Sequence, residues 1–94
     1  MAGRAPLMDR RSTESFLADL GIKIQKTSKE WITIYKGKPL RSIAVRHGKG
    51  QTGIKLPYVW KVLAEKLKRD GLEPGSKEYE KELRGMKKEA MHFI

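Results

Sequence analysis

The residues best suited to chemistry in this sequence are cations, and they lie close together in the chain. Positions 31–64 hold seven Lys and Arg and no Asp or Glu. A segment of one charge creates a field that attracts polyanions and speeds their association. The pattern predicts a surface that grips the phosphate backbone of nucleic acid through the 36–61 segment, by the residues Lys36, Lys38, Arg41, Arg46, His47, Lys49, Lys55 and Lys61. The alternatives are an acidic protein partner and a merely solvated basic face.

His47 is the candidate for proton transfer, because histidine titrates near pH 7. It lies beside Arg46 and Lys49, which could stabilise a phosphorane, and Glu30 could act as a general base. Contact with nucleic acid and an ordinary loop position remain open for His47. No catalytic residue is therefore assigned; if the protein is an enzyme, we expect a metal-independent ribonuclease that uses His47 and Glu30.

The glycine-containing segment 48–55 is not a P-loop, because Ile54 stands where that motif requires Lys after the second glycine. Glycines still allow backbone N–H groups to approach an anion, and the segment opens a predicted helix whose N-terminus attracts phosphate. The alternative interpretation is a flexible linker.

Composition excludes several classes of protein. The 94 residues predict one domain, and the absence of cysteine excludes disulfides and thiolate zinc sites. His47 and His92 have no metal-ligand spacing, so we expect no metal and no cofactor. No apolar run is long enough for a membrane span, and residues 1–11 lack the apolar core of a signal peptide. These features predict a cytoplasmic protein that does not engage a membrane.

Hydrophobic patterning divides the chain into a flexible basic arm (1–11), a nucleic-acid-binding domain (12–72) and a C-terminal helix (73–94) packed on or beside that domain. The domain's expected elements are a helix capped by Ser12, strands near 22–25, 31–35 and 40–45, and a helix over 58–69. The C-terminal helix is capped by Ser76 and nearly balanced in charge, and an oligomer could form through it.

This order predicts an α+β fold, α-β-β-β-α, in which two helices cover one face of a three-stranded antiparallel sheet. The expected inner sheet face carries Ile22, Ile24, Ile32, Ile34, Ile43 and Val45. Thr33 and Tyr35 would then point outwards, with Trp31 outward or at a rim. From there Trp31 and Tyr35 could stack on bases, or pack under the C-terminal helix.

The segment from Ser12 to Leu67 resembles the HicA family of small RNA-cleaving toxins, which have a fold like that of double-stranded-RNA-binding domains. The matching stretches are Phe16–Ile24, Ser28–Gly37 and Ile43–His47 followed by a glycine-containing loop and Pro57. The family's catalytic histidine would fall at Lys29, Glu30 or Trp31, and none of these is histidine. The resemblance therefore implies the fold and an affinity for RNA more than it implies cleavage. It also implies that an acidic partner would be an antitoxin.

Overall fold

The structure is a computed structural model, which describes residues 7–27, 29–44 and 53–93. Its elements in chain order are β1 (Leu7–Asp9), α1 (Arg10–Asp19), β2 (Ile22–Lys26), β3 (Glu30–Tyr35), β4 (Lys38–Ala44), β5 (Gly53–Lys55), α2 (Leu56–Arg69) and α3 (Lys77–Met91). The expected helix, three antiparallel strands and helix are all present, in the expected order. The fold is α+β, as predicted.

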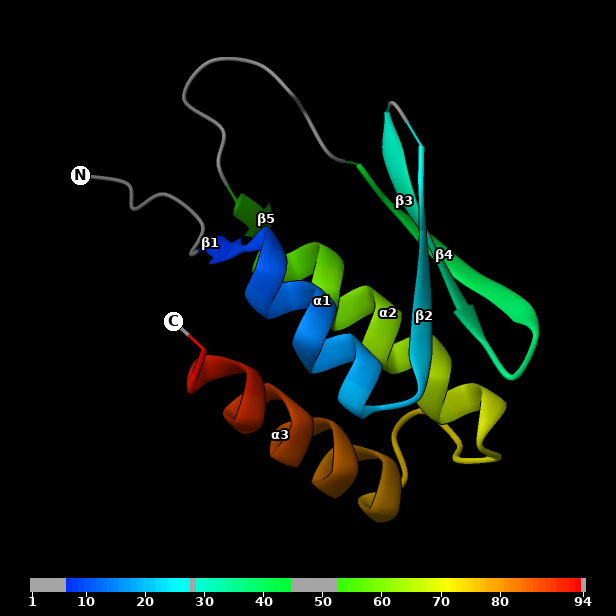
Figure 1. The fold of residues 1–94 in the computed structure, drawn as a ribbon. Coiled ribbons are helices and arrows are strands. Elements are labelled where there is room, and N and C mark those ends of the chain that lie inside the picture. Colours follow the sequence, from blue (N-terminus) through cyan, green and yellow to red (C-terminus); the bar gives the residue numbers. More distant parts are fainter. Residues whose placement is uncertain (1–6, 28, 45–52, 94) are drawn as a thin grey trace.

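The main sheet has the strand order β2-β3-β4 and is antiparallel throughout. Figure 1 shows α1 and α2 side by side on one face of this sheet, with α1 beside β2 and α2 beside β4. Phe16 and Leu17 of α1 and Val59 and Leu63 of α2 are almost completely buried. They belong to one hydrophobic core that also includes Ile43 of the sheet and Ala90 of α3.

The faces of β3 are the reverse of those predicted. Trp31, Thr33 and Tyr35 are buried, whereas Ile32 and Ile34 are only half-buried, on the other face. Both faces of this strand are apolar enough to be buried, and two aromatic rings bury more surface than two isoleucines. The predicted inward positions of Ile22 and Ile43 are confirmed, because these residues pair with Tyr35 and Trp31.

A β-bulge explains how a threonine can occupy the buried face. Ile32 pairs with Ser42 and Ile34 pairs with Pro39, so two residues of β4 lie opposite Thr33 alone. The Thr33 hydroxyl donates to the carbonyl oxygen of Arg41 and accepts from its backbone N–H at 3.1 Å. The Thr33 side chain thus supplies the hydrogen bonds that the backbone of Arg41 does not make with β3 at the bulge.

The N-terminal prediction is wrong from Leu7 onwards. Residues Leu7–Asp9, which were expected to belong to the basic arm, pair with Gly53–Lys55 in a second, two-stranded sheet. The predicted loop before α2 therefore contains a strand. Asp9, not Ser12, is the N-cap of α1, and its carboxylate accepts from the Ser12 N–H at 2.8 Å. Because β1 holds Asp9 in place, the helix begins three residues before the predicted start.

The C-terminal helix α3 lies on the side of the α1–α2 pair away from the sheet (Figure 1). Ser76 is its N-cap, as predicted, and accepts from the Tyr79 N–H at 3.2 Å. Tyr79 and Ala90 are buried, and the ring of Phe93 meets that of Phe16 edge to face at 5.9 Å. The helix is therefore packed on the domain.

Candidate nucleic-acid interface

The structure describes five of the eight residues predicted to bind nucleic acid. Lys36, Lys38, Arg41, Lys55 and Lys61 all carry exposed side chains. The other three, Arg46, His47 and Lys49, lie outside the described residues.

Lys36 and Lys38 belong to the β3–β4 hairpin, which packs beside the C-terminal end of α2. The hairpin turns through Lys36 (φ 52°) and Gly37 (φ 81°), the left-handed pair that a two-residue turn requires. The Arg69 guanidinium at the end of α2 donates from Nη2 to the carbonyl oxygen of Pro39 at 2.6 Å. Figure 1 shows the hairpin beside the last turn of α2. The fold thus joins two cationic segments that are thirty residues apart.

Asp70, the C-cap of α2, contacts this hairpin through Tyr35 and Lys36. Its two oxygens accept from the Tyr35 hydroxyl and the Lys66 ammonium, both at 2.6 Å. The Lys36 ammonium is 3.7 Å away and largely exposed. Asp70 therefore holds Tyr35 and Lys66 firmly and neutralises Lys36 only weakly.

Hydrogen bonding determines the charge of this cluster. Burial alone would raise the pKa of Asp70, but the hydrogen bonds from Lys66 and Tyr35 outweigh it and lower that pKa. Burial alone would lower the pKa of Lys66, but the hydrogen bond to Asp70 outweighs the effect of burial and raises that pKa. Both groups stay ionised at neutral pH.

A hollow of about 280 Å³ opens between the hairpin and α2, and its lining residues are Tyr35, Lys36, Lys38 and Arg69. Three of these four residues are cations. Lys38 has no carboxylate partner within the described part of the chain, and Arg69 is bonded there only to a carbonyl oxygen. The hollow is therefore a cationic site with little internal neutralisation.

The exposed face of α2 continues the positive charge away from the hairpin. Lys61 and Lys68 are seven residues apart, so they lie on one side of the helix about 10 Å from each other. The Lys61 ammonium lies over the Tyr58 ring at 5.9 Å, and Lys68 lies 3.6 Å from Glu65. We call the following residues the basic flank: Lys36, Lys38, Arg41, Lys61, Lys68 and Arg69.

Lys55 is separated from the hairpin by the length of α2. It is the N-cap of that helix, and fourteen residues of helix span about 21 Å. The cations that the structure brings together are thus those of the hairpin and of the last turn of α2. The predicted segment 36–61 includes only part of this group.

No ion pair joins the basic flank to α3 among the residues that the structure describes. The carboxylates that pair with the flank are Glu65 and Asp70, both from α2 or its cap. Glu78 and Glu82 of α3 line a separate hollow together with Lys66 and Asp70, so acidic residues of the last helix lie close to the end of α2 without pairing with the flank.

The outer face of the sheet carries no aromatic ring in the described strands. Its residues, placed by strand pairing, are Lys23, Gln25, Ile32, Ile34 and Ser42. Trp31 and Tyr35, which were expected to be outward and available for stacking on bases, are only 4% and 8% exposed. Tyr35 packs against Lys66 and Asp70 of α2, not under α3.

Glu30, the candidate general base, is half-buried at the start of β3. Its backbone N–H donates to the Thr27 hydroxyl at 3.0 Å, and that hydroxyl donates to its carbonyl oxygen at 2.8 Å. These contacts involve the backbone of Glu30 and fix the turn before β3. Within residues 7–27, 29–44 and 53–93, no three acidic or histidine side chains are grouped as metal ligands. No helix of this same part has the length and hydrophobicity needed to cross a bilayer.

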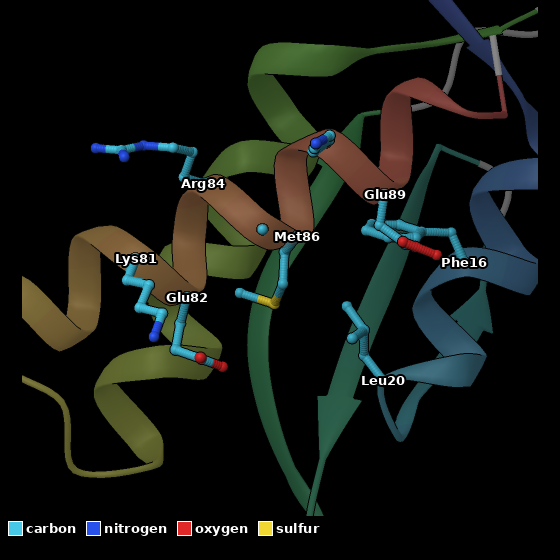
Figure 2. A pocket seen from close by; sticks show the side chains of 9 residues that line it. Phe16, Leu20, Lys81, Glu82, Arg84, Met86 and Glu89 are labelled. Atoms are coloured by element: carbon cyan, nitrogen blue, oxygen red, sulfur yellow. The ribbon is translucent and has the colours of Figure 1, made fainter.

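A second hollow, of about 480 Å³, lies between α1 and α3 (Figure 2). Phe16 of α1, Leu20 at the C-cap of that helix and Met86 of α3 point towards one another across it. Its charged lining residues carry both signs: Lys81, Glu82, Arg84, Lys88 and Glu89. Two carboxylates largely offset the three cations, so this hollow attracts a polyanion less than the hollow beside the hairpin.

The sequence interpretation did not include Arg69 and Lys68 in the candidate interface. The available signal was the basic last turn of the predicted second helix, with Lys66, Lys68 and Arg69. Basic residues there are also explained by the helix dipole, so the signal does not by itself indicate a ligand.

Comparisons of the chain with models of protein families, with curated proteins and with solved structures find no match.

Proposed function

We propose that this protein binds nucleic acid, RNA in preference to DNA, by contacts from the basic flank to phosphates. The observation that carries the proposal is the meeting of hairpin and helix cations around a hollow with little neutralisation. Lysine and arginine contacts to phosphate release counterions, which is the main source of affinity in backbone binding. The preference for RNA rests on the resemblance to the HicA family.

Recognition would be of backbone and shape more than of base identity. The described outer sheet face has no aromatic side chain for stacking, and every residue of the basic flank is Lys or Arg. Such contacts position a strand without reading its bases.

The test is a binding titration of labelled single- and double-stranded RNA and DNA at several salt concentrations. For about five neutralised phosphates, log K falls with log salt at a slope near −3.5 for single strands and −4.5 for B-DNA. Binding without such a slope would contradict the proposal. Tighter binding of DNA would overturn the preference for RNA.

A matched pair of variants tests whether the flank is the interface. Replacing Lys61 and Lys68 with Ala should weaken binding and flatten the single-strand slope by about 1.4, because two phosphate contacts are lost. The control replaces Lys77 and Lys88 of α3 with Ala, which removes the same charge from another exposed helix. Equal effects of the two double variants would mean that net charge alone drives binding.

A ribonuclease toxin of the HicA kind is the second candidate function. The observation that favours it is the order of elements, a helix followed by three antiparallel strands and a second helix, which is the order that the resemblance implies. Expression should then arrest growth, and RNA cleavage should be lost in His47→Ala or Glu30→Gln. RNA binding without cleavage by the wild-type protein would exclude this candidate.

An acidic protein partner and an oligomer formed through α3 remain predictions of the sequence. Light scattering of the protein alone measures the oligomeric state. A gel shift with RNA then separates a nucleic-acid ligand from a protein partner, because a protein-binding module would leave the RNA unshifted.

A further inference from the structure

The hollow between the β3–β4 hairpin and α2 differs from the rest of the basic flank in having walls on more than one side. Its lining comes from the end of β3, the turn, the start of β4 and the last turn of α2. A water molecule takes about 30 Å³ in the liquid, so about 280 Å³ has room for a tetrahedral oxyanion with several waters. The space therefore fits one phosphate group.

Two of the three cations around this hollow, Arg69 and Lys36, are held in place by contacts within the protein. The guanidinium of Arg69 is tied to the Pro39 carbonyl oxygen by one nitrogen at 2.6 Å, which leaves its other donors for a ligand. The Lys36 ammonium lies 5.2 Å from the Tyr35 ring centroid and 3.7 Å from Asp70. Groups fixed in this way lose little freedom when an anion binds.

The Lys38 ammonium has no carboxylate or hydrogen-bond partner among the described residues. Lys38 is exposed and follows the turn directly. Arg69 is similar, because its one bond is to a neutral carbonyl oxygen. The carboxylate of Asp70 is already satisfied by Tyr35 and Lys66 at 2.6 Å each. An entering anion would meet two cations without competition from that carboxylate.

We propose that this hollow binds one phosphate group of a nucleic-acid strand, with Lys38 and Arg69 as direct partners and Lys36 at its edge. The inference rests on the proposed function and adds to it a defined position for one phosphate. It places one phosphate at a fixed position, whereas Lys61 and Lys68, on the open face of α2, supply a field without a defined site.

The first experiment follows backbone amide signals of the full-length protein by NMR. Three probes are titrated: inorganic phosphate, a short single-stranded RNA with a 5′-hydroxyl, and the same RNA with a 5′-phosphate. The Gly37 and Lys38 amides should shift and saturate with each probe. Equal shifts with the two RNAs identify a backbone phosphate, and stronger shifts with the second identify a terminal one. Shifts that never saturate, or that occur with inorganic phosphate and neither RNA, would overturn the proposal.

The second experiment compares variants at constant salt. Lys38→Ala and Arg69→Ala should each weaken RNA binding about tenfold, the effect of losing one charge-assisted hydrogen bond. Arg69→Lys keeps the charge without the guanidinium fork and should fall between Arg69→Ala and the wild type. The control Lys77→Ala on α3 should change binding less than twofold. If Lys77→Ala weakens binding as much as Lys38→Ala, the fixed site does not exist.

Failure of the site and failure of the proposed function give different results. If RNA binds the wild type, Lys38→Ala and Arg69→Lys equally well, the protein binds nucleic acid and the hollow is not involved. If the wild type binds no RNA but inorganic phosphate saturates the Gly37 shift, the proposed function fails and the anion belongs to another ligand. Arg69→Ala could unfold the protein, because Arg69 bonds to the Pro39 carbonyl oxygen. The Lys38 side chain has no partner among the described residues, so Lys38→Ala should remain folded and still tests the site.

Discussion

A single buried hydroxyl supports the point where β3 and β4 change register. Thr33 is fully buried, and its hydroxyl bonds to both backbone groups of Arg41 opposite the bulge. An unpaired buried backbone group costs about as much as a lost hydrogen bond. The hydroxyl therefore makes the bulge compatible with a buried face.

Thr33→Val should lower the free energy of unfolding by about 1–2 kcal/mol, because the side chain keeps its shape and loses both hydrogen bonds. Urea unfolding measures the change. Thr27→Val is the matched control, since the Thr27 hydroxyl also bonds to backbone groups but is exposed, where water can replace it. Equal losses in the two variants would show that the buried hydroxyl has no special role.

Asp70 should make stability depend on pH in the acidic range. Its pKa is lowered in the folded protein by hydrogen bonds from Lys66 and Tyr35, which outweigh the effect of burial. Its contribution is therefore present above the ordinary pKa of about 4 and is lost as the pH falls through the lower folded value.

Asp70→Asn should be less stable than the wild type by about 1 kcal/mol near pH 7, a modest value because the carboxylate is partly exposed to solvent. Thermal melts from pH 7 down to pH 2 test this. The difference between the two proteins should shrink as the pH falls below about 4. A difference that stays constant down to pH 2 would contradict the role given to the ionised carboxylate.

At the scale of elements, the two-stranded sheet β1–β5 fixes both the start of α1 and the approach to α2. Asp9 pairs with Gly53, and the next residues after each strand begin a helix. The strands approach closely at this point, because a Cβ on Gly53 would lie 3.0 Å from both the Leu7 Cβ and the Met8 carbonyl oxygen. Two short strands thus align two helices.

Gly53→Ala should lower the free energy of unfolding by about 1–2 kcal/mol, since β1 must move to admit the methyl group. Gly85→Ala in α3 is the control: nothing lies within 4 Å of its added Cβ, and alanine favours a helix by about 1 kcal/mol. The two variants should therefore shift the melting temperature in opposite directions. Stabilisation by both would mean that β1 and β5 are not closely packed.

At the scale of the whole molecule, the packing of α3 predicts that this helix unfolds together with the sheet. It buries Tyr79 and Ala90, and the Lys87 ammonium lies over the Trp60 ring of α2 at 5.6 Å. A helix packed in this way should not melt before the rest of a domain of this size.

Tyr79→Ala should lower the free energy of unfolding by about 3 kcal/mol through loss of buried aromatic surface. Far-UV circular dichroism and tryptophan fluorescence, which reports Trp31 in the sheet and Trp60 in α2, should give the same transition. Two separate transitions would show that α3 is an independent unit.

The sequence by itself determined the order and type of the main elements, because hydrophobic period, turns and caps are local properties. Gly21 ends α1, Ser76 starts α3, and the alternating residues after Gly21 form strands. The excess of cations was equally visible, since it needs only a count.

Only the tertiary structure decided which face of β3 is buried and which cations lie together. Both faces of β3 are apolar, so its alternation does not choose between them, and the choice follows from the rings and from the Thr33–Arg41 bonds. Arg69 reaches Pro39 only because the hairpin packs on the end of α2. Such long-range packing has no local signature, because it depends on how the sheet and the helices are placed against each other.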